Sequence, residues 1–494
     1  MGVIIKQSAY ASIINYIGVA VGAVNMIFLF PEFLGQEKLG FFQAFTSMAI
    51  ILSPFAQLGL PRSTLRYFPR FNKGPESTGR FFTFVLITAF FTIALFIGIF
   101  QLVDQWVFGF FEKNAPELID QYWHIIILAG ILVYISIFES FYKAKLNVVI
   151  PTFLREFFMR IMSSLLALLF FLDNISFEWF LRLTIAVYAV SLLIMILILL
   201  VKGQLRFNIS IFQLEKSFIK ELSKYMVFVM AGAVGSIIVL RIDTLMVTGY
   251  LGFNENAIYT IAFFMGTIIE IPKRSISQMS DAIIANAFEN ERLDEIKKIY
   301  KQSSINQLIL GCFVFILVAI NLENIYAIMP EGDLYSSGKW IVIIIGLSKL
   351  INMGFGVSAE IIISSKYYKS NIYFVLTLAA LTIGLNVILI PKYGLIGAAI
   401  ATFTSVLLFN LIKMIFIFYR LQFQPFSIHT LTTILLSGLC FLILSMVPQF
   451  SHPILNGAYL TLLTFLIFGL LMLFFKPSKE ITKIIQPFLD KFNL

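Results

Sequence analysis

Three arginines recur at every fourth residue in the stretch GLPRSTLRYFPRFNKG, residues 59–74, which lies between two long apolar runs. If this stretch continues the helix before it, Arg62, Arg66 and Arg70 lie on one face, because residues four apart are neighbours on a helix. Three guanidinium groups at the level of the lipid headgroups would attract an anion, since their planar shape matches phosphate oxygens. The spacing therefore predicts an anion-binding face.

Eight further ionisable residues lie inside apolar runs. A charge costs about 2.5–3.5 kcal/mol at the centre of a membrane helix, so each of these residues needs a partner, a route to the surface or a hydrated cavity. Residues within about a turn of a helix end can extend their charge to the surface. The set consists of Arg160, Arg182, Arg241, Lys349, Glu139, Asp243, Glu270 and Glu360. The deepest members are Arg160, Arg241, Asp243 and Lys349.

The composition requires that membrane-spanning elements hold these side chains. Of the 494 residues, 59% are hydrophobic and 13% are charged, so lipid must be the solvent. The net charge of +9 fits basic cytoplasmic loops, and we predict no nucleic-acid partner. Cys312 and Cys440 lie inside apolar runs and imply no disulfide framework.

Apolar runs of this length predict an all-α membrane protein with fourteen transmembrane helices, because backbone polar groups in hydrocarbon must be satisfied within each segment. An even number of spans places both termini on one side. The expected spans are 9–30, 41–60, 81–101, 122–142, 153–171, 179–200, 225–248, 257–275, 303–322, 340–364, 371–390, 395–418, 430–447 and 454–475.

The loops between these spans differ sharply in charge. Twenty-eight Lys and Arg residues fall on the side shared with the termini, and four fall on the other side. This count assigns Lys413 to the first side, with the loop cations. Basic loops stay in the cytoplasm, so we predict cytoplasmic termini in a multi-pass protein of the inner membrane. Arg62, Arg66 and Arg70 help to hold their loop on that side.

Two segments suggest an internal repeat. LGQEKLGFFQAF, residues 34–45, and LGFNENAIYTIA, residues 251–262, lie 217 residues apart, which corresponds to six helices. Each has Leu-Gly, a small residue five positions later and an aromatic residue two positions beyond that. The repeat predicts two parallel six-helix lobes. We expect the first lobe at 1–220, the second at 221–424, and two helices with a cytoplasmic tail at 425–494.

Polar and small residues form stripes on two of the expected helices. Such stripes favour either close helix packing or a hydrated cavity, and the sequence leaves both open. Arg241 and Asp243 are two residues apart, so only one of them can face a central cavity squarely. The stripes are Asn15, Gly18, Gly22 and Asn25 in the first helix, and Lys349, Asn352, Gly356 and Glu360 in the tenth.

Four segments resemble the polysaccharide (O-antigen type) flippases of the MATE-like superfamily. They are LNVILIPKYGLIGAAIATFTS (385–405), FLGQEKLGFFQAF (33–45), LGLPRSTLRYFPR (58–70) and RIDTLMVTGYLGFNENAIYTIA (241–262). The resemblance covers essentially the whole chain. It implies two six-helix lobes around a central cavity, with two added C-terminal helices. It also implies transport of polyprenyl-pyrophosphate-linked oligosaccharide from the cytoplasmic to the outer leaflet, by alternating access, for cell-surface polysaccharide synthesis.

Under this resemblance, a doubly charged pyrophosphate must cross about 30 Å of hydrocarbon. We therefore expect Arg62 and Arg66 to attract the substrate and Arg241 and Lys349 to support it at depth. Asp243 and Glu360 are candidates for ion coupling. The expected partners are the lipid-linked glycan, the bilayer, and a polysaccharide polymerase or glycosyltransferases. We expect a monomer that needs no cofactor or metal.

Two other functions compete with this interpretation. A MATE-type exporter of drugs or other small molecules would use the same fold, with Asp243 essential for Na⁺ or H⁺ coupling. An enzyme acting at the outer surface would need a sizeable loop with acid, base and phosphate-binding residues. The longest expected outer loops are 102–121 and 323–339, and their only basic residues are Lys113 and Lys339. We therefore predict a transporter and not an enzyme.

Overall fold

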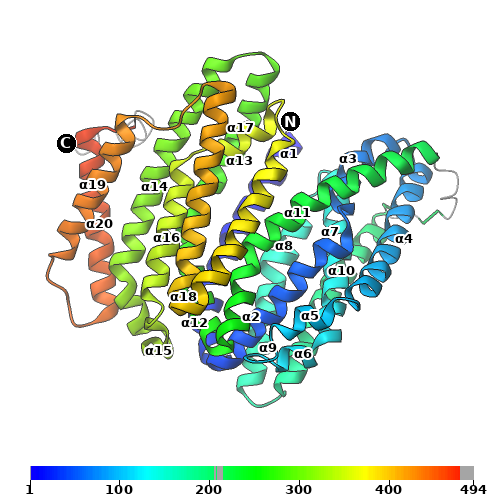
Figure 1. The fold of residues 1–494 in the computed structure, drawn as a ribbon, viewed down its shortest axis with the longest axis horizontal. Coiled ribbons are helices and arrows are strands. Elements are labelled where there is room, and N and C mark those ends of the chain that lie inside the picture. Colours follow the sequence, from blue (N-terminus) through cyan, green and yellow to red (C-terminus); the bar gives the residue numbers. More distant parts are fainter. Residues whose placement is uncertain (1, 205–206, 209–214, 479–494) are drawn as a thin grey trace. The chain divides into compact units, whose positions relative to one another are not determined.

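The computed structural model describes residues 2–204, 207–208 and 215–478, and all of the regular elements in these ranges are helices (Figure 1). Within them, nine helices are long and apolar enough to cross a membrane, or ten when one bent pair is counted as a span. The chain is thus an all-α, multi-pass membrane protein. The C-terminal part of the expected tail, residues 479–494, lies outside the described residues.

The chain divides into two compact units, Met1–Ala257 and Ile258–Leu494. The sequence places the boundary between the lobes earlier, at 220/221, in front of the seventh expected span. That span belongs to α11, Lys216–Leu251, which packs along α2, Phe30–Gln57, in the first unit. Packing against α2 therefore keeps α11 with the first unit in this division.

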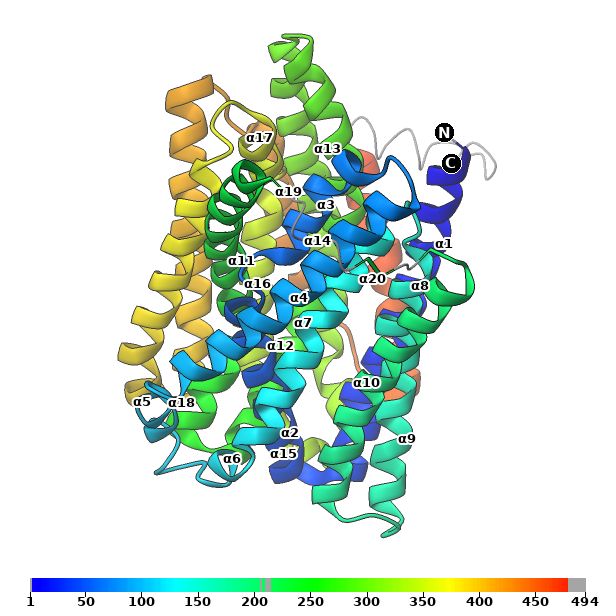
Figure 2. The same cartoon turned by 90° about the vertical axis from the view of Figure 1, so that its right-hand side faces the viewer.

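The first unit consists of helices that pack mainly around α2 and α7. Figure 2 shows α4, α7 and α10 running beside one another in this unit. The elements are α1 Gly2–Val24, the π-helix η1 Asn25–Leu29, α2, α3 Leu60–Phe71, α4 Pro75–Phe100, α5 Asp104–Gly109, α6 Glu117–Asp120, α7 Tyr122–Ala144, α8 Val149–Phe153, the π-helix η2 Leu154–Phe158, α9 Met159–Phe171, α10 Phe177–Val201 and α11. Helix α12, Phe253–Thr267, crosses into the second unit.

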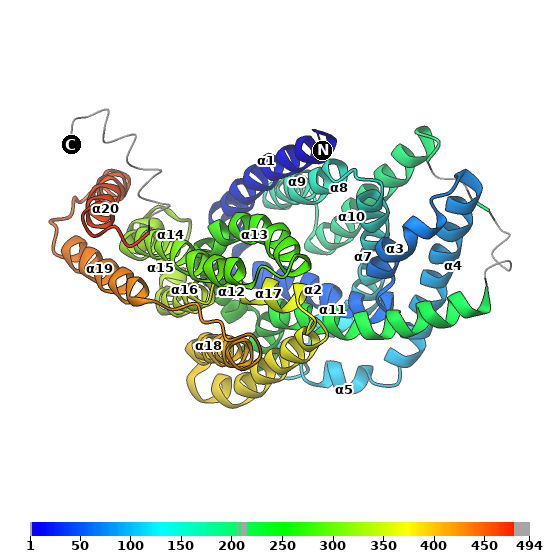
Figure 3. The same ribbon diagram turned by 90° about the horizontal axis from the view of Figure 1, so that it is seen from above.

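The second unit packs around α14, which contacts α16, α19 and α20 along its length. Figure 3 shows α13 and α17 next to each other at one end of this unit. The elements are the 3₁₀-helix η4 Ile268–Glu270, α13 Ile271–Glu289, α14 Leu293–Ile328, α15 Gly332–Ser336, α16 Lys339–Gly354, α17 Ser358–Ser364, α18 Ser370–Leu421, α19 Ile428–Ser445 and α20 Pro453–Phe475.

Two of the membrane-spanning candidates each cover two expected spans. The segment Tyr10–Gln57 is interrupted at Gly35, and Ser370–Leu421 is interrupted at Gly394, where the backbone leaves the helical conformation. The expected spans 153–171 and 257–275 fall on helices broken by η2 and η4. Every expected span therefore has a helical counterpart, which is consistent with fourteen crossings.

The proposed repeat has a conformational basis. Gly35 adopts φ 68° and ψ 174°, and Gly252, in the second copy, adopts φ 98° and ψ −174°. Only glycine enters this region readily. The two copies also touch, because the Asn256 amide donates to the Gly40 carbonyl at 2.8 Å and the Gln36 amide donates to the Asn254 carbonyl at 3.1 Å.

Gly40 permits this contact, and Gly40→Ala is expected to destabilise the first unit. An added Cβ would lie 1.8 Å from the Phe253 carbonyl oxygen, so the backbones would have to separate. Overpacking of this kind typically costs about 1–3 kcal/mol. A thermal unfolding midpoint measured in detergent tests the expectation. Gly98→Ala is the control, because a Cβ there meets nothing within 4 Å; equal midpoints for the two variants would contradict it.

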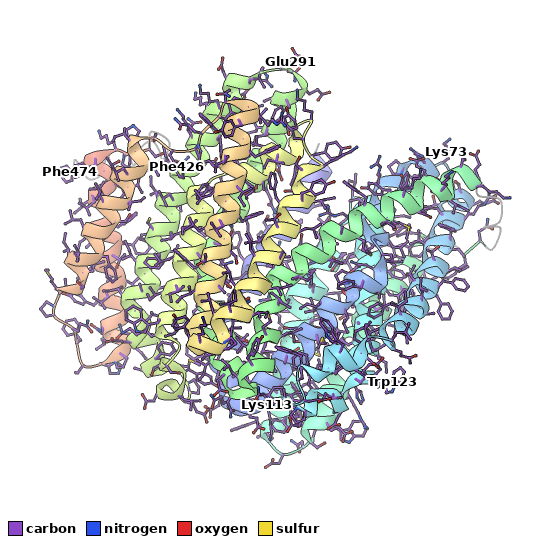
Figure 4. All side chains as sticks on the ribbon, viewed as in Figure 1. Lys73, Lys113, Trp123, Glu291, Phe426 and Phe474 are labelled. Carbon is purple, nitrogen blue, oxygen red and sulfur yellow. The ribbon has the colours of Figure 1, made fainter. Side chains whose placement is uncertain are left out.

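The ends of the first unit carry residues from loops expected on opposite sides of the membrane. Figure 4 shows Lys73, from an expected cytoplasmic loop, at one end of the unit, and Lys113 and Trp123 at the other. In the second unit, Glu291 marks the connection between α13 and α14. The arrangement of helices within the first unit is thus compatible with the predicted sidedness of its loops.

Candidate anion-binding cluster

Helix α3 displays the three arginines of the opening motif on its exposed face. Leu60 follows the left-handed Leu58 and Gly59, which separate α3 from α2. Arg62 and Arg66 are exposed, and the Arg66 guanidinium lies 4.2 Å from the centroid of the Tyr225 ring. The expected common face is confirmed by the helix. Binding of an anion by Arg62 and Arg66 stays a prediction.

Arg70, on the same face, binds a carboxylate of the protein. Its two terminal nitrogens donate to the Glu221 carboxylate at 3.0 and 3.2 Å, and Tyr67 donates to the same group at 3.0 Å. Burial and this hydrogen bond raise the pKa of the Tyr67 phenol, so the phenol remains a donor at neutral pH. Arg70 is therefore exposed, but it is paired with Glu221.

A second polar cluster joins α1 to α9. The Arg160 guanidinium donates to the Gly18 carbonyl at 2.6 Å and to the Glu156 carboxylate at 2.6 Å. The Asn25 amide donates to the Arg160 carbonyl at 3.0 Å. A Cβ on Gly22 would lie 1.8 Å from the Arg160 guanidinium. The glycine stripe of the first helix thus serves close packing around a half-buried ion pair.

Arg241 and Asp243 differ in burial, as their angular separation on α11 predicts. Asp243 is 4% exposed, whereas Arg241 is half-buried and lies within electrostatic range of Tyr188. Tyr188, on α10, is also within range of Arg160. The first unit therefore holds two arginines near one tyrosine, and the roles of Arg241 and Asp243 stay predictions.

The second unit brings Lys349 together with groups that the sequence did not connect to it. Lys349 lies on α16, and its ammonium nitrogen is 3.5 Å from Oε2 of Glu270. The other oxygen, Oε1, accepts from Asn352 at 2.5 Å and from Lys273 at 3.3 Å. Lys273 also donates to the Asn352 carbonyl at 3.4 Å. Two ammonium groups and an amide thus converge on one carboxylate.

Lys413 extends this cluster and corrects the sequence analysis. The charge count places Lys413 among the cytoplasmic loop cations, but the structure buries it on α18 with 3% exposure. Its ammonium lies 4.1 Å from the centroid of the Phe409 ring. It interacts electrostatically with Lys273, Glu360 and Glu270. We name Glu270, Lys273, Lys349, Asn352 and Lys413 the lysine cluster.

Glu360 does not lie on one continuous helix with Lys349, contrary to the stripe expected for residues 340–364. Helix α16 ends at Gly354, Gly356 adopts φ +58°, and α17 begins at Ser358 with a bend of 46°. The part of the stripe that holds is the pair Lys349 and Asn352, because both contact Glu270. Glu360 instead lies within electrostatic range of Asp281 and Lys413.

An apolar cavity of about 530 Å³ lies beside this part of α16. Its walls come from α14, α16, α18 and α19, and they are almost entirely carbon. Leu350 and Ile351, which line it, are the residues between Lys349 and Asn352 in the chain. Helix α16 therefore carries ammonium and amide groups on one face and part of the wall of an apolar cavity on another.

The arrangement of helices can be compared with solved structures. The lipid II flippase MurJ in an inward closed conformation matches over 94% of this chain and 98% of that chain, with a TM-score of 0.73 and 16% identity. The chain has the MATE-like fold. An inward-facing multidrug resistance MATE family transporter of the MOP superfamily matches over 83% and 94%, with a TM-score of 0.65 and 11% identity. A MATE protein in the straight conformation matches over 85% and 96%, with a TM-score of 0.55 and 12% identity.

Sequence comparisons give no further relatives: no protein-family model matches the chain, and no curated protein matches it. The expected fold class is thus confirmed by the arrangement of the helices. In this MATE-like fold, Lys349 meets Glu270 and Lys273, which sequence reasoning had treated as residues near a helix end or in a loop. A lysine placed within the span 395–418 was the available signal for Lys413.

Proposed function

We propose that the protein moves a polyprenyl-pyrophosphate-linked oligosaccharide from the cytoplasmic to the outer leaflet for the synthesis of cell-surface polysaccharide. Such a substrate has a doubly charged head and a long hydrocarbon tail. The observation that carries the proposal is the pairing on α16 of the lysine cluster with the adjacent apolar cavity. The likeness of the fold to a structure named as a lipid II flippase supports it.

The charged groups would lower the barrier to crossing the hydrocarbon. A charge moved into a low-dielectric region without compensation is very costly, and fixed cations replace the lost hydration. Arg62 and Arg66 would attract the pyrophosphate at the cytoplasmic surface. Lys273 and Lys349 would bind it in the second unit, and Arg241 would supply positive charge in the first. The polyprenyl tail would lie against carbon, as the cavity wall offers.

The transport cycle would expose these groups alternately to the two sides of the membrane. Asp243 and Glu360 would couple or release an ion, and one elementary charge moved through 100 mV is worth about 2.3 kcal/mol. A polymerase or glycosyltransferases would act on the same lipid-linked glycan before or after its passage.

Depletion of the protein tests this function. We expect lipid-linked oligosaccharide to accumulate on the inner leaflet, because its head group can no longer cross, and expression of the wild-type chain to reverse the accumulation. The measurement is the fraction of glycan that an impermeant glycosidase or lectin reaches in sealed, oriented vesicles. An unchanged distribution between the leaflets after depletion would refute the proposal.

A MATE-type exporter of small molecules is the second candidate, and the buried carboxyl of Asp243 favours it. It predicts that a Na⁺ or H⁺ gradient drives export of a dye and that Asp243→Asn abolishes that export. Glycan translocation without gradient-driven dye export would reject this candidate.

A further inference from the structure

The carboxylate of Glu270 occupies a position that would suit a phosphate group. Asn352 and Lys273 donate hydrogen bonds to it at 2.5 and 3.3 Å, and the Lys349 ammonium forms an ion pair with it at 3.5 Å. Ammonium and amide donors that bind a carboxylate bind phosphate oxygens by the same charge-assisted hydrogen bonds. The two helices that supply these donors, α13 and α16, both contact η4, which carries Glu270, and this packing holds the arrangement in place.

The charge of the surrounding lysine cluster is not balanced by Glu270 alone. Lys413 is 3% exposed, and among the described residues no carboxylate oxygen lies within 4.0 Å of its ammonium. Lys273 repels the Lys413 ammonium, and Glu360 and Glu270 attract it. Lys273 and Lys349 therefore share one directly bound carboxylate, while Glu360 and Glu270 act on Lys413 only at longer range. Two cations that share one carboxylate leave an excess of positive charge, and this excess favours an additional or a more highly charged anion.

The cluster is partly exposed. The side chains of Glu270, Lys273 and Lys349 keep 25%, 17% and 14% of their area exposed. An arriving phosphate would find the donors of Lys273, Lys349 and Asn352 already bound to Glu270. It would compete with that carboxylate for them.

We propose that Glu270 is a built-in competitor for the phosphate-bearing head group of the ligand. Its carboxylate and the pyrophosphate bind the same lysines in turn, so that the return of Glu270 helps to release the ligand. This inference rests on the proposed function and adds how the affinity of the lysine cluster for the ligand is regulated. Glu270 is thus a positioning residue that acts through Lys273 and Lys349.

The test is the binding of inorganic pyrophosphate to the full-length protein in lipid nanodiscs, measured by titration calorimetry. Glu270→Gln is expected to tighten binding roughly ten- to a hundredfold, the range for a displaced hydrogen bond to a charged group. Glu323→Gln is the matched control, because Glu323 pairs with Lys339 at an exposed position on α14, and we expect no change there. Binding that is unchanged or weaker in Glu270→Gln overturns the inference.

A second ligand tells whether the bound pyrophosphate belongs to a lipid or is a free anion, and a second variant guards against misfolding. A short-chain prenyl pyrophosphate should bind more tightly than inorganic pyrophosphate if the head belongs to a lipid, and equally if it is a free anion.

Glu270→Asp, which keeps the charge on a shorter side chain, should show a smaller gain than Glu270→Gln. If Glu270→Gln does not fold, an unchanged affinity in Glu270→Asp overturns the inference. Adding Lys349→Gln to either variant should remove the gain, and a persisting gain would also overturn it.

The outcome separates this inference from the proposed function. If wild-type protein translocates the lipid-linked glycan while Glu270→Gln leaves pyrophosphate affinity unchanged, the competitor role fails and the function stands. If Glu270→Gln tightens pyrophosphate binding but depletion of the protein leaves the glycan distribution unchanged, the competitor role stands and the function fails.

Discussion

Replacing Lys349 with glutamine is expected to slow translocation of the lipid-linked glycan about ten- to a hundredfold, the effect of losing one hydrogen bond to a charged group. Lys349 has only 14% of its side chain exposed and supplies one of the two ammonium groups bound to Glu270. Without it, the pyrophosphate loses a cation, and Glu270 retains only Lys273 and Asn352. The measurement is the initial rate of translocation in proteoliposomes that contain equal amounts of protein.

Lys339→Gln is the control for this prediction, because Lys339 begins the same helix but pairs with Glu323 at a position where 42% of its side chain is exposed. We expect a rate close to that of the wild type. Arg241→Gln should slow translocation as well, since Arg241 is the half-buried cation of α11. Normal rates in both Lys349→Gln and Arg241→Gln would remove these residues from the mechanism.

Arg160→Met should lower the stability of the first unit by about 1–3 kcal/mol, the usual cost of leaving polar partners unsatisfied in a partly exposed pair. The guanidinium satisfies the Gly18 carbonyl and neutralises Glu156, whose side chain is 16% exposed. Methionine fills a similar volume but donates no hydrogen bond. The measurement is the midpoint of thermal unfolding of the purified protein.

Arg182→Met offers a comparison in the same unit, because Arg182 pairs with Glu178 where both side chains are largely exposed. Exposed pairs contribute about 0–1 kcal/mol, so little change is expected. The double variant Glu156→Gln and Arg160→Met should recover part of the lost stability, since the Glu156 carboxylate would otherwise keep only Arg155 as an ion-pair partner. Equal losses of stability in Arg160→Met and Arg182→Met would show that the cluster between α1 and α9 stabilises the first unit no more than an exposed ion pair does.

Sequence reasoning succeeded where a local rule determines the structure. Apolar length predicts the spanning helices because hydrocarbon leaves the backbone no other partner. Leu-Gly at 34–35 and at 251–252 suggested an internal repeat, and both glycines adopt the same conformation, which other residues rarely enter. The spacing of Arg62 and Arg66 predicted a shared face because helical geometry alone sets it.

It failed where the answer depends on which helices are neighbours. Glu270 was interpreted as a residue near a helix end, although Lys273 and Lys349 bind it. Lys413 was counted with the loops, although its position on α18 buries it. No spacing rule connects positions 270, 349 and 413, because their proximity arises from the packing of η4, α16 and α18 in the second unit. The break at Gly356 was missed because both flanking segments are apolar.

Three connections between long helices consist of little more than one glycine, at Gly35, Gly252 and Gly394. The predicted topology directs all three to the outer side of the membrane. Proteases cut most readily at exposed loop tips, and a single-residue corner provides no such loop. Protease treatment of spheroplasts should therefore leave these hairpins uncut, and reagents that tag loops on the outer side will find few places to attach there.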